Sequence, residues 1–328
     1  MYLVIWVDDI LLCAANKMEA AKMKKIMANR FCMKDFGYIS YFLGIEFEVC
    51  KSYIFMHQSK YVDKVLEKFR MKDCHPKVCP CDASCLNSAW EDSEHLTDPR
   101  LYREIVGSLI YLMMCTRPDI CFIVNLLSQH MSRPKMVHLN LAKFVLKYLK
   151  GSKDKGLIFC PSEAIDIVGY TDASWANCTD RKSISGYCFS LAIGSSLVSW
   201  KSKKQPIVTL SSCESEYVAT AYAVQEGCFL QQLLRDFEQC TNLKQINLYA
   251  DNQGAIELGK NPVYHQRSKR IDTRFHFIRD KVAEGLLKFV YVPSKDNVAD
   301  IFTKPCTAAS LYKFGVANSL KSISTREH

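Results

Sequence analysis

The sequence has no long apolar run, no low-complexity segment and no export signal. Its longest apolar stretch, from about Val106 to Cys115, is shorter than the roughly 20 residues that a membrane-spanning helix requires. The apolar start lacks a basic flank and meets Asp8 and Asp9 at once, which is not typical of a signal peptide. We therefore expect an intracellular protein, cytoplasmic or nuclear, that is not secreted and has no membrane partner.

No extreme of composition excludes a folded protein. Hydrophobic residues make up 48% of the 328 positions and charged residues 23%, which is ordinary for globular chains. This length predicts two or three domains. The net charge of +9 divides into +5 for residues 1–150 and +4 for the remainder, so neither half is a basic arm. Binding to a polyanion must therefore be argued from local clusters.

The sixteen cysteines do not form a recognisable zinc motif or a disulfide framework. They are scattered along a chain without an export signal, which favours reduced thiols. Cys74, His75, Cys79, Cys81 and Cys85 lie within twelve positions, but no Cys-x-x-Cys pair is present. We expect core thiols here and keep zinc as the alternative.

Changes of pattern divide the chain into five segments. Residues 1–97 contain an apolar hairpin around Asp8 and Asp9, further short strands and helices, and a final loop rich in Cys, Pro, Asp and Ser. Residues 98–150 have helical apolar spacing interrupted by prolines. We predict a linker at 151–160, a third folded unit at 161–306 and a tail at 307–328.

The third unit is predicted to be an α/β domain. Strands at about 165–175, 184–193 and 196–201 precede a long helix, a strand at 246–250, two helices, a strand at 287–292 and a helix from Asn297. This order predicts a mixed sheet flanked by helices.

Four acids stand at similar places in that unit, at strand ends or in the first turns of helices: Asp172, Glu216, Asp251 and Asp300. Singly, each has a structural explanation as a turn residue, a helix cap or a solvated acid. The neighbouring Glu214 fits a capping box with Ser211 and needs no catalytic role. Three or four converging carboxylates, in contrast, are the ligands that a pair of Mg²⁺ ions requires for phosphodiester cleavage.

Six ordered motifs resemble the RNase H domain of copia-type long-terminal-repeat retrotransposons. They are residues 171–176, 180–187, 199–206, 214–217, 250–253 and 299–305. The resemblance implies an RNase H-like fold and hydrolysis of the RNA strand of RNA/DNA hybrids. It also implies that Asp172, Glu216, Asp251 and Asp300 bind two Mg²⁺ ions, with Mn²⁺ as an alternative ion and without a small-molecule cofactor. The loop at 293–296 lacks the histidine that many cellular relatives have.

The same resemblance suggests contacts with the nucleic acid. It implies that Gln253 contacts the minor groove of the hybrid, where the 2′-hydroxyl distinguishes RNA from DNA. We expect basic side chains to meet phosphates, with a solvated basic face as the alternative. They are Arg181, Lys182, Lys201, Lys203, Lys204, Arg267, Lys269 and Arg270. We assign no role to His265 or His276.

Residues 1–150 resemble the C-terminal part of the same family's reverse transcriptase, at 6–11, 41–46, 102–112 and 116–120. The resemblance makes 1–97 a truncated palm and thumb and 98–150 a helical thumb or connection. Asp8 and Asp9 are then a vestigial polymerase pair, because the sequence does not contain the third palm carboxylate. We expect an RNase H without autonomous DNA polymerase activity, with other Pol chains and virus-like particles as possible associations; the alternative is an inactive remnant that only binds nucleic acid.

Overall fold

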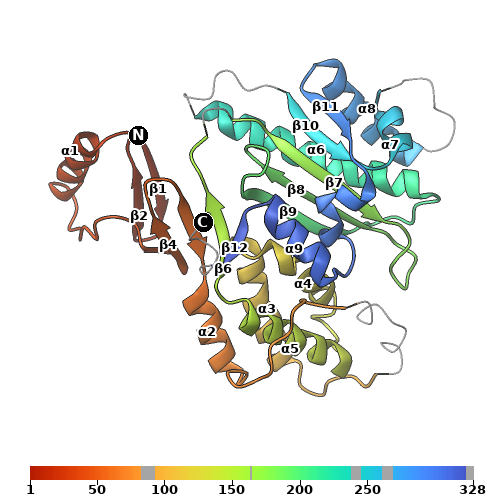
Figure 1. Ribbon diagram of the computed structural model, residues 1–328, viewed down its shortest axis with the longest axis horizontal. Coiled ribbons are helices and arrows are strands. Elements are labelled where there is room, and N and C mark those ends of the chain that lie inside the picture. The colour runs from red at the N-terminus through yellow and green to blue at the C-terminus, as the bar shows by residue number, and fades with distance from the viewer. Residues whose placement is uncertain (83–92, 163–164, 238–244, 261–268, 323–328) are drawn as a thin grey trace.

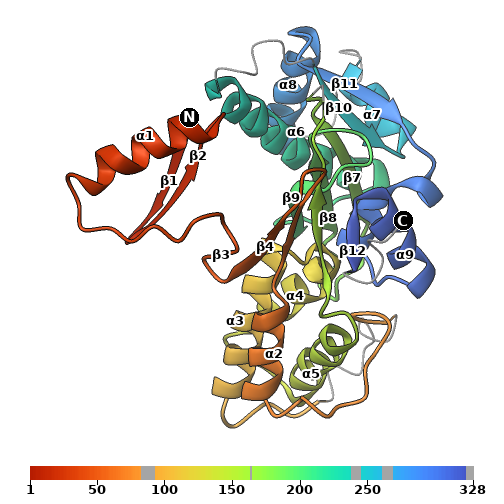
Figure 2. The ribbon, with the colours of Figure 1, turned by 60° about the vertical axis from the view of Figure 1, so that its left-hand side comes forward.

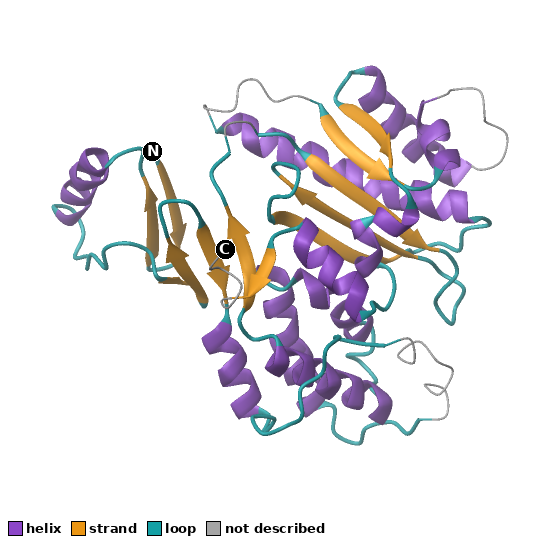
Figure 3. Ribbon diagram, viewed as in Figure 1, coloured by secondary structure: helices purple, strands orange, loops and turns teal. Residues whose placement is uncertain are grey.

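The computed structural model describes residues 1–82, 93–162, 165–237, 245–260 and 269–322, with only the backbone for residues 269–275. Figure 1 shows three regions: a hairpin and helix at the N-terminus, a layer of helices, and a large sheet flanked by helices. Groups of strands and groups of helices follow one another along the chain (Figure 3). Every helix within the described ranges is too short or too polar to span a lipid bilayer.

The N-terminal hairpin consists of β1 (Tyr2–Trp6) and β2 (Asp9–Cys13), paired in antiparallel fashion as predicted. α1 (Lys17–Ala28) follows and begins where the Asn16 side chain accepts a hydrogen bond of 2.9 Å from the Glu19 amide. No residue of α1 is buried, and α1 projects away from the other elements (Figure 2), whereas the Tyr2 ring of β1 lies 4.9 Å from the ring of Phe237.

A second antiparallel sheet has the order β12-β6-β5-β4-β3. Its strands are β3 (Tyr41–Phe42), β4 (Ile45–Val49), β5 (Ile54–His57), β6 (Lys155–Phe159) and β12 (Leu320–Ser322). The prediction of a linker at 151–160 is therefore wrong for residues 155–159. Gly156 is required for close strand pairing, because a Cβ there would lie 2.3 Å from the Met56 carbonyl oxygen. The predicted tail likewise contains β12 and α9 (Ala308–Ala317).

The helical layer comprises α2 (Ser59–Lys68), α3 (Arg100–Cys115), the 3₁₀ helix η3 (Pro118–Ile120), α4 (Cys121–Ser128) and α5 (Met136–Gly151). A buried ion pair fixes its centre, because Arg117 Nη2 lies 2.7 Å from Asp119 Oδ2 and both side chains are at most 1% exposed. The Tyr148 hydroxyl donates to the same carboxylate oxygen at 2.5 Å, and Arg117 Nη1 donates to the Ser152 carbonyl at 2.9 Å. These bonds join η3 to the end of α5.

The third sheet has the order β11-β10-β7-β8-β9. Its strands are β7 (Val168–Ser174), β8 (Ile184–Ser190), β9 (Leu197–Lys204), β10 (Ile246–Ala250) and β11 (Leu287–Tyr291). β10 is parallel to both β7 and β11, whereas β8 is antiparallel to β7 and to β9. This is the mixed sheet that the sequence predicted.

Helices cover both faces of this sheet. α6 (Ser212–Asp236) packs on one face together with α7 (Gln253–Lys260) and α8 (Lys269–Ala283), while α4, α9 and the 3₁₀ helix η5 (Val298–Phe302) pack on the other. β8 is consequently buried at every residue.

The segment after β11 is not the α-helix that was expected from Asn297. It forms two short 3₁₀ helices, η4 (Ser294–Asp296) and η5. Pro305 disfavours a helical conformation at Lys304. The Asn297 side chain also ties the segment to the sheet by donating a 2.9 Å hydrogen bond to the Thr171 carbonyl of β7.

Candidate active site

Three of the four predicted acids meet at one edge of the third sheet. Asp172 lies in β7, and Asp251 directly follows β10, its parallel neighbour. Glu216 lies near the start of α6. One carboxylate oxygen from each lies within 4.8 Å of the others, and no other group of three or more potential metal ligands occurs in the described ranges. Parallel strands end at the same edge of a sheet, which brings Asp172 and Asp251 together.

The start of α6 is fixed by its cap. The Ser211 hydroxyl accepts a 3.1 Å hydrogen bond from the Glu214 amide, and Glu214 Oε2 accepts one of 2.6 Å from the Leu210 amide. Glu214 thus serves the cap, as predicted, although its carboxylate accepts from the Leu210 amide rather than from the Ser211 amide. Glu216, about half a turn further on, points inward and is only 8% exposed.

Asp172 is 3% exposed. The Thr303 hydroxyl donates a hydrogen bond to its Oδ2. Burial, with a further contribution from the negative charge of Asp300, raises the pKa of Asp172 to about 7. Without a bound cation, this carboxyl therefore holds a proton at neutral pH for a large fraction of the time.

Glu216 carries the clearest sign of a missing partner. Its Oε2 is buried and accepts no hydrogen bond from any described residue. Burial raises the pKa of Glu216 well above its ordinary value, and the charges of Asp172 and Asp251 add to the shift. A buried carboxylate oxygen without a donor is costly, unless a cation replaces the missing interaction.

Asp300 stands beside the three clustered acids rather than among them. It lies in η5, where its Oδ1 is 2.9 Å from Lys304 Nζ. Burial raises the pKa of Asp300, against the opposing effect of Lys304. Gly186 of β8 allows η5 to approach the sheet, because a Cβ there would lie 2.7 Å from Phe302 Cβ.

Sequence reasoning gave no role to Lys304 and Thr303. The ammonium of Lys304 is partly buried, which lowers its pKa, but the charges of Asp172 and Asp300 more than offset this and raise it overall. Lys304 thus supplies a fixed positive charge at the edge of the acidic cluster. Both residues follow Asp300 in the motif at 299–305, so that motif was the available signal.

The predicted nucleic-acid residues fall into different environments. Gln253 is exposed at the first position of α7, two residues after Asp251. Lys182 and Lys204 lie 3.7 and 3.0 Å from the Asp180 carboxylate, so both have an acidic partner. Of the others, Arg181, Lys201 and Lys203 are exposed.

Some predicted residues are not placed at this site. Arg267 and His265 lie outside the described residues, and so do the side chains of Lys269 and Arg270, whose backbone belongs to α8. Asp8 and Asp9 are exposed at the turn and start of β2 in the N-terminal hairpin, and they belong to no cluster of three potential metal ligands in the described ranges.

Comparisons with known proteins place these features in context. Residues 1–83 match the family described as reverse transcriptase (RNA-dependent DNA polymerase). The chain is 36% identical over 312 residues to the retrovirus-related Pol polyprotein from transposon TNT 1-94 of Nicotiana tabacum, which covers 92% of this chain but only 23% of that protein. It is also 38% identical over 227 residues to an uncharacterized mitochondrial protein of Arabidopsis thaliana, covering 69% of this chain and 92% of that protein.

Among solved structures, the chain resembles the foamy viral protease-reverse transcriptase in complex with dsDNA. The TM-score is 0.50 at 13% identity, over 89% of this chain and 55% of the other. At this identity the likeness concerns the fold alone. Together with the observed sheets, it confirms the predicted α/β fold class.

Proposed function

Since the chain belongs to the family of the retrovirus-related Pol polyproteins of copia-type transposons, we propose that its third sheet and flanking helices form a ribonuclease H. The proposed reaction is hydrolysis of the RNA strand of RNA/DNA hybrids with two Mg²⁺ ions, for which Mn²⁺ is an alternative. The observation that carries the proposal is the convergence of Asp172, Glu216 and Asp251 around a buried carboxylate oxygen that has no donor.

The residues present fit a hard divalent cation. All three side chains offer oxygen ligands, which Mg²⁺ prefers, and their ligand atoms lie within 4.8 Å of one another. Glu216 Oε2 is buried without a hydrogen-bond donor in the described ranges, and a cation is the kind of partner that would satisfy it. Asp172, Glu216 and Asp251 would hold the metal, and Asp300 would complete the set from η5.

Bound Mg²⁺ would lower the pKa of an attacking water and stabilise charge on the leaving oxygen. The chain's own residues prepare the site for this chemistry. Burial raises the pKa values of Asp172 and Glu216, that of Asp172 to about 7, so protons compete with a cation for these oxygens and metal affinity should rise with pH near neutrality. Lys304 holds Asp300 in place by the 2.9 Å ion pair and offsets part of the negative charge.

Recognition of the hybrid is assigned to residues around this edge of the sheet. Gln253 is exposed next to Asp251, where it could contact a 2′-hydroxyl of the RNA strand. Exposed basic side chains nearby, Arg181 among them, would contact phosphates.

The test is cleavage of a labelled RNA/DNA hybrid by the purified chain in Mg²⁺, with double-stranded DNA as the specificity control. We expect the RNA strand to be cut. Asp172→Asn should abolish cutting, because the amide keeps the shape and removes the metal-binding charge. Asp280→Asn, an exposed acid of α8, is the matched control and should cut normally.

Two results would count against the proposal. If the wild-type chain binds the hybrid but never cuts it, the inactive nucleic-acid-binding alternative is the better account. If Asp172→Asn cuts as fast as the wild type, the clustered acids are not the catalytic group.

A further inference from the structure

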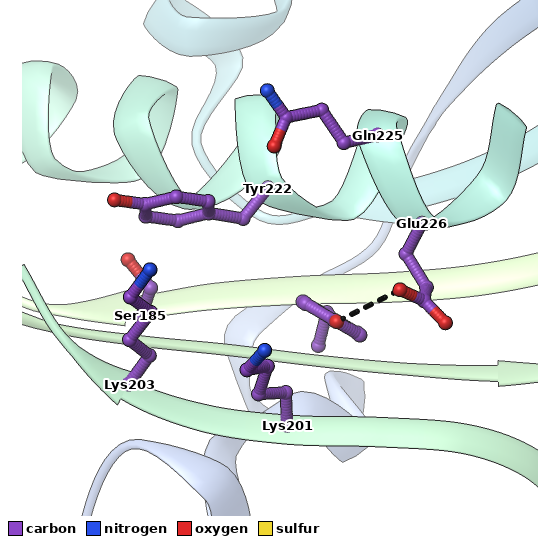
Figure 4. Close-up of a pocket in the computed structure, with 7 residues that line it drawn as sticks. Ser185, Lys201, Lys203, Tyr222, Gln225 and Glu226 are labelled. Atoms are coloured by element: carbon purple, nitrogen blue, oxygen red, sulfur yellow. Dashed lines mark hydrogen bonds between the residues drawn. The ribbon is translucent and has the colours of Figure 1, made fainter. Parts of the chain in front are cut away.

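A cavity of about 220 Å³ lies between strand β9 and helix α6, outside the cluster of acids. It is lined by Ser185 and Tyr187 of β8, Lys201 and Lys203 of β9, and Tyr222, Gln225 and Glu226 of α6. Figure 4 shows both lysines rising from β9 toward α6, with the Tyr222 ring and Gln225 on the opposite side.

The two lysines share one face of the strand because residues two apart in a β-strand point the same way. Neither forms an ion pair with a carboxylate in the described ranges, in contrast to Lys182 and Lys204. Lys203 is held in position, since its Nζ lies 4.5 Å from the centre of the Tyr222 ring.

The acid that lines the cavity, Glu226, offsets only part of the positive charge of the two lysines. Glu226 Oε1 accepts a 2.7 Å hydrogen bond from the Ser199 hydroxyl, and its Oε2 accepts one of 3.2 Å from the Tyr187 hydroxyl. The lining therefore holds two ammonium groups against one carboxylate, which leaves it net positive, and that carboxylate already has two neutral hydrogen-bond donors.

A group with several acceptor oxygens and negative charge matches this lining. Lysine binds phosphate as a point charge, and the Gln225 amide and Ser185 hydroxyl can add hydrogen bonds. A cavity of 220 Å³ is smaller than the pockets of roughly 300 Å³ and above that enclose whole small-molecule ligands. Its size suits a phosphate group attached to a larger chain.

The cavity lies close to the acidic cluster. Lys203 pairs with Ser185, and Ser185 pairs with Ala173, which adjoins Asp172 in β7 but faces α6, whereas the Asp172 side chain faces η5. Two strand spacings separate Lys203 from β7, or about 10 Å. Along α6, Tyr222 follows Glu216 by six residues, or about 9 Å.

We propose that this cavity binds one phosphate of a nucleic-acid strand, a few nucleotides from the phosphate that is cleaved. The inference rests on the proposed function and adds a second anchoring point for the hybrid. Lysines on an edge strand also discourage edge-to-edge pairing of sheets. That role does not require the side chains to point into a cavity. It also predicts that bound nucleic acid does not shield these lysines from chemical modification.

The test uses the full chain carrying Asp172→Asn, so that the hybrid is bound without turnover. Lysines are acetylated with a soluble N-hydroxysuccinimide ester, and each site is followed by mass spectrometry. The hybrid should slow acetylation of Lys201 and Lys203 at least threefold and leave Lys288 and Lys321 unchanged; the latter pair are exposed lysines of β11 and β12.

A second arm measures hybrid binding by fluorescence anisotropy at several salt concentrations. The Lys201→Gln/Lys203→Gln variant should lower the slope of log affinity against log salt by about 0.9, the value for one phosphate. The Lys288→Gln/Lys321→Gln variant removes the same charge and should leave the slope close to that of the parent.

Inorganic phosphate at constant ionic strength separates the two sources of the ligand. Protection of the pocket lysines by phosphate but not by the hybrid would overturn the assignment to a strand in favour of a free anion. Normal binding of the hybrid with unprotected pocket lysines would overturn the inference and leave the proposed function intact. Failure of the hybrid to bind at all would instead remove the proposed function.

Discussion

Asp172→Asn should stabilise the metal-free protein at alkaline pH even though we expect it to abolish the proposed cleavage. The wild-type carboxyl is buried at 3% exposure and keeps its proton up to a pKa of about 7, against 3.8 in an unfolded chain. Asparagine imitates the protonated form at every pH and can still accept the hydrogen bond from Thr303. The substitution therefore removes the free-energy cost of ionising a buried carboxyl, which destabilises the folded wild type as the pH rises.

The sign and size of this stabilisation follow from the pKa values of Asp172 in the folded and in the unfolded state. Below pH 3.8 the carboxyl is protonated in both the folded and the unfolded state, so its ionisation takes no stability from the folded wild type. This stability is lost progressively as the pH rises toward 7, because the unfolded state ionises first. Three pKa units at about 1.4 kcal/mol each set an upper limit of about 4 kcal/mol. Glu216 shares the titration with Asp172, so we expect a gain of about 1 to 3 kcal/mol at pH 8.

Urea unfolding of both proteins in EDTA, at pH 4 and at pH 8, measures this gain. The quantity compared between the two pH values is the free energy of unfolding of the mutant minus that of the wild type. The mutant should match the wild type at pH 4 and exceed it at pH 8. Millimolar Mg²⁺ should then stabilise the wild type more than the mutant, because the ion binds the folded site. A mutant that is less stable at pH 8, or a difference that does not change with pH, would refute the assignment of a buried, protonated Asp172.

Three other substitutions test the contacts of Asp300 and η5 and the buried ion pair of the helical layer. Lys304→Gln removes the ammonium that lies 2.9 Å from Asp300; it should raise the pKa values of the acids further and shift the pH profile of cleavage to higher pH, whereas an unchanged profile would argue against this role. Asp119→Asn leaves the buried guanidinium of Arg117 without its charge partner and should lower the free energy of unfolding by about 3 to 5 kcal/mol, measured by urea denaturation; a loss under 1 kcal/mol would show that the pair is dispensable. Gly186→Ala places a Cβ within 2.7 Å of η5, and it should reduce cleavage more than hybrid affinity because η5 carries Asp300; equal losses in both would contradict this.

The sequence alone determined the order of the elements that form the third sheet and the identity of the acids. Alternating strand and helix patterns gave the mixed sheet, since the apolar spacing of each strand and of α6 agrees with its position in the fold. Asp172, Glu216 and Asp251 were identified because hard-cation chemistry needs several carboxylates and because they lie in ordered motifs. Local signals also sufficed for the Ser211 cap of α6.

Only the tertiary structure decided which residues complete the site and where segments 155–159 and 308–322 belong. Gly156 looks like a linker glycine in the sequence, but a strand from each side approaches it in space. The same is true of the electrostatic effect of Lys304 on Asp172, which depends on the packing of η5 against the sheet, and of the cavity between β9 and α6. These features arise from pairings between residues far apart in the chain, and the local pattern of residue types carries no information about such pairings.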